Sequence, residues 1–307
     1  MKNKIRINQI KVGEVCGLSI PLTKIKIGKG EEKIGILVGV HGDEVSGLLV
    51  IEQLIKKLAD KTLNKTVVIF PLTNLLAQIL RQRENPLDNK DLNRSFPGNQ
   101  KGEFSERLAN LLLEELKGFN LVIDLHTFET PCPITAISME NGSRKVKKKS
   151  RQAIEIFQPQ VIWKLSLKDQ QEVTLSGSLG PILHNLKIPN FAVEMSPHSM
   201  IDSDEINQVC WGLERLIFDC FIKKEEKIPI IKRQKILVDE SGLFTSVKRV
   251  FDQVKKGDSL GNLTKLPNFK SRKITSLFSG FVLTIKREAL VNTGDHLGVI
   301  AKTVDYW

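Results

Sequence analysis

The sequence predicts an α/β protein with a mixed, largely parallel sheet covered by helices on both faces, followed by a small all-β domain. Through the first two thirds of the chain, short apolar segments alternate with amphipathic ones, as strands alternate with helices. A charged run ending in proline, residues 223–229, then changes the composition. Beyond it lie short strand-like segments without a long helix. We therefore expect two domains, over residues 1–227 and 228–307.

The expected elements follow one another in a regular order. Loosely alternating apolar residues in segment 1–27 predict edge strands, and the uniformly apolar segment 34–40 predicts a buried strand. Apolar residues recur at helical spacing between residues 48 and 58, which predicts an amphipathic helix. Further strands are expected at 66–72, 121–126, 134–139, 161–165 and 190–195. Further helices are expected at 104–117, 142–156, 177–187 and 202–221, the last capped by Asp202 or Ser203.

The C-terminal segment contains a weak internal repeat. Residues 256–261 (KGDSLG) are similar to residues 293–298 (TGDHLG). Paired Gly-Asp turns predict a small β barrel or sandwich with two similar halves. The arrangement resembles the biotinyl/lipoyl-like fold, but no lysine occupies a clear hairpin tip, so we expect no covalent cofactor.

The composition is that of a globular protein, with 307 residues, 41% hydrophobic content and a net charge of +11. Much of the excess charge lies in short runs such as residues 144–149, which predict a solvated lysine-rich surface. Nucleic-acid binding is the alternative, but no basic stretch is interleaved with aromatic residues that could stack on bases. We expect no nucleic-acid partner. The positive field would steer a small anionic substrate to the protein.

The chain contains no sign of export or membrane insertion. No apolar stretch approaches the length of a membrane span, and the basic N-terminus lacks the apolar core of a signal peptide. The four cysteines are far apart in sequence and form no Cys-x-x-Cys pair. These observations predict a cytoplasmic protein with reduced thiols and no membrane partner. A homodimer is left open.

Two candidate metal ligands lie on the turn that follows segment 34–40. His41 and Glu44 are three residues apart, and Gly42 lets the backbone bend between them. Open α/β sheets bind ligands at the carboxyl ends of their strands, and an imidazole and a carboxylate there could hold zinc together. A catalytic zinc site needs a third protein ligand, and His126 at the end of another apolar strand is the best candidate.

These residues, together with the loop after them, resemble the succinylglutamate desuccinylase/aspartoacylase family, which has the zinc carboxypeptidase-like fold. The resemblance rests on four motifs in the family's order: HGDE at 41–44, RENPLDNKDLNRSFPG at 83–98, DLH at 124–126, and Glu194 in AVEM. It covers residues 34–196, and the organisation of the remainder also fits. The resemblance implies one Zn²⁺ per chain, held by His41, Glu44 and His126.

The resemblance also assigns the other site residues. Glu194 would be the general base and acid, which requires a carboxylate with a raised pKa in a dry pocket. Asn93 and Arg94 would bind the carboxylate of the amino-acid part of the substrate. Arg83 would polarise the scissile carbonyl, although Arg81 could take its place.

The remaining polar residues near these motifs have less specific interpretations. Asp124 either orients a ligand or an arginine, or makes a purely structural hydrogen bond. Asp91 is expected to tie the loop together through its backbone. His184, His198 and His296 are interpreted as structural, with His198 the best of the three for lining a pocket because it follows Glu194 closely.

The sequence therefore predicts a zinc-dependent amidohydrolase that removes an acyl group from a small, anionic N-acyl amino acid. Succinyl, acetyl and aspartate-type substrates are not distinguished. The alternatives are a metallocarboxypeptidase that cuts peptides and a non-catalytic small-molecule-binding protein of the same fold. By resemblance, the C-terminal β domain narrows the entrance and favours small substrates over peptides.

Overall fold

The computed structural model describes residues 5–166, 177–220 and 227–307. Its elements are β1 Arg6–Val15, β2 Leu18–Ile27, β3 Lys33–Val38, α1 Ser46–Ala59, β4 Thr66–Phe70, α2 Leu75–Leu80, the 3-10 helix η1 Leu92–Arg94, α3 Phe104–Leu116, β5 Leu121–Thr127, β6 Thr135–Met139, α4 Arg144–Phe157, β7 Val161–Leu165, α6 Leu179–Asn185, β8 Asn190–Met195, α7 Ser203–Phe218, β9 Pro229–Leu237, β10 Gly242–Ser246, β11 Gln253–Val254, β12 Ser259–Lys265, β13 Lys270–Thr275, β14 Gly280–Ile285, β15 Glu288–Val291 and β16 His296–Tyr306.

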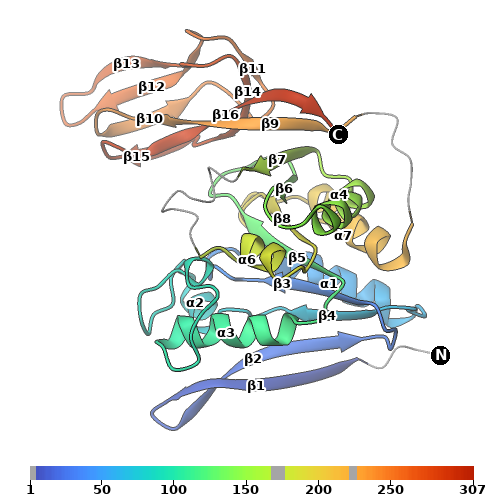
Figure 1. Cartoon of the computed structure of the whole chain (residues 1–307). Helices are drawn as coiled ribbons and strands as arrows, with labels where there is room; N and C mark the ends of the chain where they lie inside the picture. The colour runs from blue at the N-terminus through green and yellow to red at the C-terminus, as the bar shows by residue number, and fades with distance from the viewer. Residues whose placement is uncertain (1–4, 167–176, 221–226) are drawn as a thin grey trace.

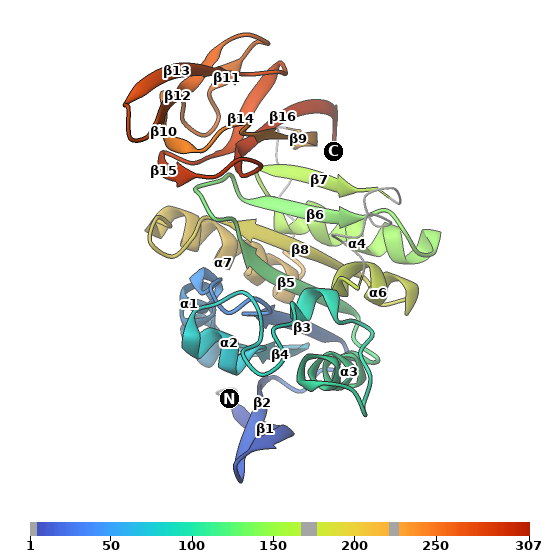
Figure 2. The same ribbon diagram turned by 90° about the vertical axis from the view of Figure 1, so that its left-hand side faces the viewer.

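One long mixed sheet runs through the described part of the chain (Figures 1 and 2). Its strand order is β1-β2-β4-β3-β5-β8-β6-β7-β9-β16-β14-β11. The centre is parallel, because β3 pairs with β4 and β5, and β5 pairs with β8. β6 runs antiparallel to β8 and parallel to β7. The predicted mixed α/β architecture is confirmed, whereas the carboxypeptidase-like classification stays a prediction.

Helices cover both faces of this sheet, each over its own hydrophobic core. On one face α1, α4 and α7 pack against residues such as Ile36 and Ile123. On the other face α3 and α6 pack against residues such as Leu37 and Val122. Adjacent residues of one strand thus serve opposite cores, as the alternation of side chains in a strand requires. His126 shares the face of Val122, which is the α3 and α6 side.

The expected helices and strands of the first 220 residues are present with small changes at their ends. The helix expected at 202–221 is α7, and the Asp202 side chain caps it by accepting a hydrogen bond from the Glu205 amide at 2.8 Å. The basic run on α4 exposes Arg144, Lys145, Lys148 and Lys149, as a solvated surface predicts. None of the helices in the described ranges has the length and apolar character needed to cross a bilayer.

The C-terminal segment is built from strands, as predicted, but part of it extends the large sheet. β9 pairs in parallel with β7, and β16, β14 and β11 continue from it. The strands β13-β12-β10-β15 form a second, four-stranded sheet, and a separate hydrophobic core joins the two groups. Most of the charged linker at 223–229 lies outside the described residues. The two-domain division therefore stays a prediction.

The two halves of the internal repeat have the same turn. Gly257 and Gly294 both adopt positive φ, at 95° and 91°. In each turn the aspartate that follows the glycine accepts a backbone hydrogen bond, from Lys255 to Asp258 at 2.9 Å and from Asn292 to Asp295 at 2.8 Å. The glycine is needed for the left-handed backbone and the aspartate for closing the turn. The repeated sequence is thus a repeated turn that precedes β12 and β16.

Candidate metal centre and active site

The turn between β3 and α1 carries the first two candidate ligands. Gly39 begins it with φ of 72°. The turn lies tightly against α2, because the Gly42 amide donates to the Gln82 carbonyl at 3.0 Å and the Asn74 amide donates to the Gly39 carbonyl at 3.0 Å. A Cβ at Gly42 would lie 2.0 Å from the Ala77 carbonyl carbon, so a larger residue cannot fit there. This packing directs His41 and Glu44 inward.

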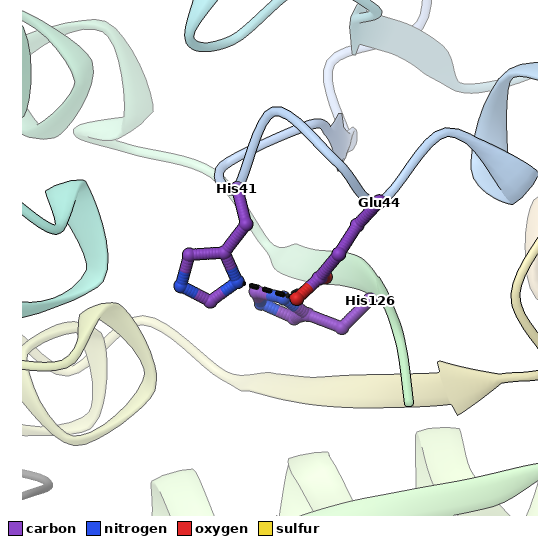
Figure 3. Close-up of side chains that lie close together, drawn as sticks. All are labelled: His41, Glu44 and His126. Carbon is purple, nitrogen blue, oxygen red and sulfur yellow. Dashed lines mark hydrogen bonds and ion pairs between the residues drawn. The ribbon is translucent and has the colours of Figure 1, made fainter. Parts of the chain in front are cut away.

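His41, Glu44 and His126 converge on one point, although they come from segments 82 residues apart (Figure 3). One ligand atom from each residue lies within 4.8 Å of the other two. The Glu44 carboxylate bridges the rings, with Oε1 2.6 Å from His41 Nδ1 and Oε2 2.8 Å from His126 Nδ1. All three residues are buried. Imidazole nitrogens and a carboxylate are the donor set of a catalytic zinc site.

Two further carboxylates lie behind the rings and fix their orientation. Asp91 Oδ1 lies 3.1 Å from His41 Nε2, and Asp124 Oδ2 lies 2.8 Å from His126 Nε2. A ring that donates Nε2–H to a carboxylate keeps the lone pair of Nδ1 for a metal. Asp124 thus contacts a candidate ligand. The expectation that Asp91 ties the loop through its backbone was incomplete, since its side chain contacts His41 across 50 positions.

The charges of this cluster favour a cation. Burial tends to raise the pKa of Glu44, but the charges of His126 and His41 outweigh it and hold that pKa well below its usual value. Burial tends to lower the pKa of His126, but Asp124 and Glu44 raise it instead. With both imidazoles neutral, the cluster holds the three carboxylates of Glu44, Asp91 and Asp124. A divalent ion, together with the Arg83 guanidinium bound to Asp91, would balance this charge in a buried site, so the residues present fit zinc.

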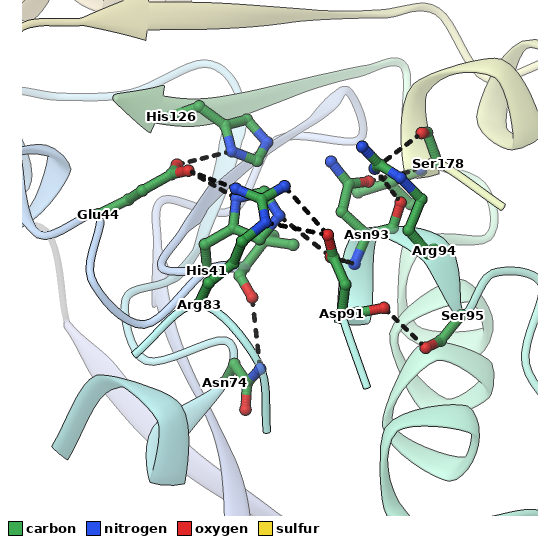
Figure 4. Close-up of polar contacts among 12 residues, drawn as sticks. His41, Glu44, Asn74, Arg83, Asp91, Asn93, Arg94, Ser95, His126 and Ser178 are labelled. Atoms are coloured by element: carbon green, nitrogen blue, oxygen red, sulfur yellow. Dashed lines mark hydrogen bonds and ion pairs between the residues drawn. The ribbon is translucent and has the colours of Figure 1, made fainter. Parts of the chain in front are cut away.

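Arg83 lies beside the candidate ligands, whereas Arg81 is exposed to solvent. Arg83 donates from Nε and Nη2 to Asp91 Oδ2 at 3.2 and 3.0 Å, and its Nη1 lies 3.7 Å from Glu44 Oε1 (Figure 4). It lines the cavity described below. Arg81 ends α2 in the left-handed conformation, with φ of 51°, and its exposed side chain is not part of the cavity wall. The structure thus brings Arg83, and not Arg81, to the candidate ligands.

Asn93 and Arg94 form a short 3-10 helix beside α6. Asp91 begins this helix by accepting a hydrogen bond from the Asn93 amide at 2.7 Å. Asn93 Oδ1 accepts from the Leu179 amide at 2.9 Å, and Arg94 Nη1 donates to the Ser178 hydroxyl at 3.3 Å (Figure 4). Both side chains line the cavity. Arg94 is half-buried, so its guanidinium has a fixed place at the cavity wall.

Glu194 lies beside the candidate ligands because β8 pairs with β5. The register aligns Glu194 with His126, so both side chains point to the same face of the sheet. Glu194 lines the same cavity as the three candidate ligands. Burial raises its pKa, and the nearby charge of His126 opposes that rise. A carboxyl group in this position can hold a proton at a pH where an exposed glutamate has lost it.

One cavity of about 810 Å³ is lined by the three candidate ligands and by Arg83, Asn93, Arg94 and Glu194. Strands from the middle of the chain and from its C-terminal segment form its wall. Its floor is the face of the large sheet. Lys235, Lys286 and His296 reach it from β9, from the residue after β14, and from β16. The interpretation of His296 as structural was therefore incomplete. No sequence signal distinguished these three residues, because nothing local indicates that the C-terminal strands join this sheet.

The other two histidines lie away from the cavity. His184 is buried, with Nε2 2.9 Å from the Ser150 hydroxyl and Nδ1 3.0 Å from the Asn141 carbonyl oxygen, as a structural histidine would be. His198 is exposed and is not among the described lining residues. Of the three histidines interpreted as structural, His296, and not His198, lines the cavity.

Comparison with known sequences places this site in a family. The sequence model described as the succinylglutamate desuccinylase/aspartoacylase catalytic domain matches residues 31–217, which include the three candidate ligands and Arg83, Asn93, Arg94 and Glu194. The chain belongs to the succinylglutamate desuccinylase/aspartoacylase family. A curated relative, N-alpha-acetyl-L-2,4-diaminobutyric acid deacetylase from Halomonas elongata, is 34% identical over 109 residues. That match spans 35% of this chain and about a third (32%) of the relative.

Solved structures of other proteins share the fold along nearly the whole chain. The product-bound ectoine utilization protein EutE from Ruegeria pomeroyi superposes with a TM-score of 0.85 at 17% identity, over 99% of this chain and 96% of that one. An aspartoacylase family protein from Mesorhizobium loti gives a TM-score of 0.82 at 22% identity, over 98% and 95% of the two chains. These structures show that other proteins combine the two regions of this chain in one fold.

Proposed function

We propose that this protein is a zinc-dependent amidohydrolase that removes the acyl group from a small N-acyl amino acid. The observation that carries the proposal is the arrangement of His41, Glu44 and His126 around one point, with Glu194 beside His126 on the next strand. The family membership and the deacetylase name of the Halomonas relative support it.

The chain's own residues would hold the metal in a fixed geometry. His41 Nδ1, His126 Nδ1 and a Glu44 oxygen would be the ligand atoms, and the hydrogen bonds to Asp91 and Asp124 would hold the two imidazole rings in the orientation that this requires. When bound, zinc supplies Lewis acidity and lowers the pKa of a coordinated water. A site with three protein ligands would leave room for that water, as catalytic zinc sites do.

Glu194 and Arg83 would carry the proton and charge movements. Glu194 takes a proton from the attacking water and later gives a proton to the leaving nitrogen, for which its raised pKa is suited. Arg83, beside Glu44, faces the carbonyl oxygen as negative charge develops there. Its two hydrogen bonds to Asp91 hold the guanidinium in place before the substrate binds.

Asn93 and Arg94 would bind the substrate carboxylate at the part of the cavity wall next to Ser178. Arg94 is held by Ser178 and by the Asn93 carbonyl oxygen, which Nη1 reaches at 2.7 Å. A guanidinium that is already ordered loses little entropy when it binds a carboxylate. The C-terminal strands would close one side of the cavity and limit the size of the substrate.

Metal analysis and a hydrolysis screen test the proposal. The protein should bind one zinc per chain and release amino acids from a panel of N-acyl amino acids. His41→Ala should lose zinc and activity, whereas His198→Ala, a matched histidine outside the cavity, should retain both. Glu194→Gln should keep stoichiometric zinc while kcat falls by about 10²–10⁴-fold. Stoichiometric zinc in His41→Ala, or near wild-type turnover in Glu194→Gln, would overturn the assignment.

The same panel separates the two alternatives. A metallocarboxypeptidase would release C-terminal residues from peptides of several residues, which the wall built by β9 and β16 should exclude. A non-catalytic binding protein would bind zinc and an N-acyl amino acid without turnover.

A further inference from the structure

The end of β5 carries one candidate ligand and orients another. His126 is the last but one residue of β5, and the amide of the next residue, Thr127, donates a hydrogen bond to Glu44 Oε2 at 3.0 Å. The amide of Phe128, the residue after that, donates to the Met195 carbonyl oxygen of β8 at 2.9 Å. The position of residues 126–128 therefore affects both His126 and Glu44.

Arg233 of β9 lies against the last residue of this segment. Its guanidinium carbon Cζ is 5.1 Å from the centre of the Phe128 ring and 4.0 Å from the centre of the Trp163 ring. A cation within about 6 Å of a ring centre is attracted to the face of the ring, and a flat guanidinium group stacks well on it. Arg233 thus connects the end of β5 to β7.

The Trp163 side of this contact is held by packing. Trp163 packs against two hydrophobic clusters, and it pairs with Ile231, two residues before Arg233, where β7 meets β9. Phe128, in contrast, follows the last residue of β5 and is only partly buried. The guanidinium therefore holds the end of a strand against a well-packed part of the sheet, and we expect the end of β5 to be less ordered without it.

A second contact joins the same two parts of the chain, but it is weak. Lys286 Nζ, from the residue after β14, lies 3.8 Å from a carboxylate oxygen of Glu129. The Glu129 side chain is 69% exposed, and ion pairs of exposed groups contribute little to stability. Of these two described contacts with the C-terminal strands, the one made by Arg233 is therefore the stronger.

Arg233 also brings a positive charge to the cavity that it lines. Burial raises the pKa of Glu194, and the charge of Arg233 is one of those that oppose this rise. Replacing Arg233 would consequently alter turnover whether or not the ligands moved. Zinc affinity separates the two effects by sign, because removing a nearby positive charge would by itself strengthen the binding of a cation. A weaker affinity has to come from the lost contact.

We propose that Arg233 is a positioning residue of the metal centre, which acts through Phe128 on His126 and Glu44. This inference rests on the proposed function, because it requires zinc to bind at these ligands. It gives the C-terminal strands a part in building the metal centre, since Arg233 lies outside residues 31–217, which the catalytic-domain model matches.

The test measures zinc affinity by competition with a chromophoric chelator at constant pH. A cation–π contact corresponds to a factor of about 2–30 in an equilibrium constant, so Arg233→Met should bind zinc about 3–30-fold more weakly than the wild type. The matched control is Arg151→Met, which removes a guanidinium whose Cζ lies 5.7 Å from the centre of the Trp307 ring. Neither Arg151 nor Trp307 is among the described lining residues of the cavity.

We expect Arg151→Met to change the zinc affinity less than about twofold, because it removes the same kind of contact away from the metal centre. Weakening of less than about threefold in Arg233→Met, or equal weakening in both variants, would overturn the inference.

A double-mutant cycle tests whether Arg233 acts through Phe128. Phe128→Leu removes the ring and should also weaken zinc binding by about threefold or more, so it serves if Arg233→Met does not fold. The double variant should bind zinc within about twofold of the more weakly binding single variant, because both substitutions remove one contact. Independent, multiplying effects would show that Arg233 does not act through Phe128 and would overturn the inference.

Kinetics with the zinc-saturated protein separate this role from binding of an anionic substrate group. The ratio of KM for N-acetylaspartate to KM for N-acetylasparagine should be the same in Arg233→Met and the wild type. A rise of this ratio with unchanged zinc affinity would make Arg233 a substrate-binding residue, which overturns the inference and leaves the proposed function intact. Failure of the wild type to bind zinc would refute the proposed function as well.

Discussion

Asp91 is the residue whose replacement most directly tests how the metal centre is built. Its Oδ1 lies 3.1 Å from His41 Nε2 and accepts from the Asn93 amide at 2.7 Å, and its Oδ2 accepts from Arg83. Asp91→Ala removes the group that fixes the His41 ring and its tautomer. Losing such a partner of a metal ligand typically weakens zinc binding 10–100-fold, which corresponds to about 1.4–2.7 kcal/mol.

The control must loosen the same loop without touching a ligand. Replacing Asp88 does this, because its side chain accepts hydrogen bonds from the Ser105 amide at 2.6 Å and from the Ser105 hydroxyl at 2.9 Å and does not contact a candidate ligand. Asp88→Ala should therefore lower the stability of the loop by about 1 kcal/mol and leave the zinc affinity close to that of the wild type.

Zinc affinity is measured by competition with a chromophoric chelator at constant pH. We expect Asp91→Ala to compete at least tenfold less well than the wild type, with Asp88→Ala within about twofold. Equal affinity in Asp91→Ala and the wild type would refute the inference that this carboxylate orients His41. Equal weakening in both variants would show that loop stability, and not the contact with His41, controls binding.

Three further predictions concern the stability and reactivity of the protein. Leu54→Ala in the buried face of α1 should cost about 2–5 kcal/mol in chemical denaturation, whereas Leu49→Ala on the exposed face of the same helix should cost less than about 1 kcal/mol. Chelation should lower the melting temperature of the zinc-loaded protein but not that of His41→Ala, since a ligand stabilises only a state that binds it; equal shifts would exclude this site. Thiol labelling of the reduced native protein should modify Cys16 and Cys220 first, because they are exposed, while the buried Cys132 and Cys210 react only on unfolding; burial also raises the pKa of Cys210 to about 11.

Local sequence was enough to place most of the elements and most of the candidate site, but not the helix α2 or the 3-10 helix η1. The apolar segment before His41 and the alternation before His126 placed both histidines at strand ends, and the structure places them there. Glu194 was likewise found near the end of an apolar strand. Each of these predictions depends on the order of residues within a single segment, and periodicity reports that order directly.

The sequence by itself therefore determined which residues lie at the ends of which strands. It also contained the motifs that mark the chain as a member of the family. Only the tertiary structure decided which of these segments become neighbours. It placed Asp91 against His41, turned Arg83 inward and Arg81 outward, and brought His296 to the cavity by joining β9 to β7. The physical reason is that periodicity shows which side of a segment faces the interior. The partner on that side depends on strand pairing and loop packing between distant parts of the chain.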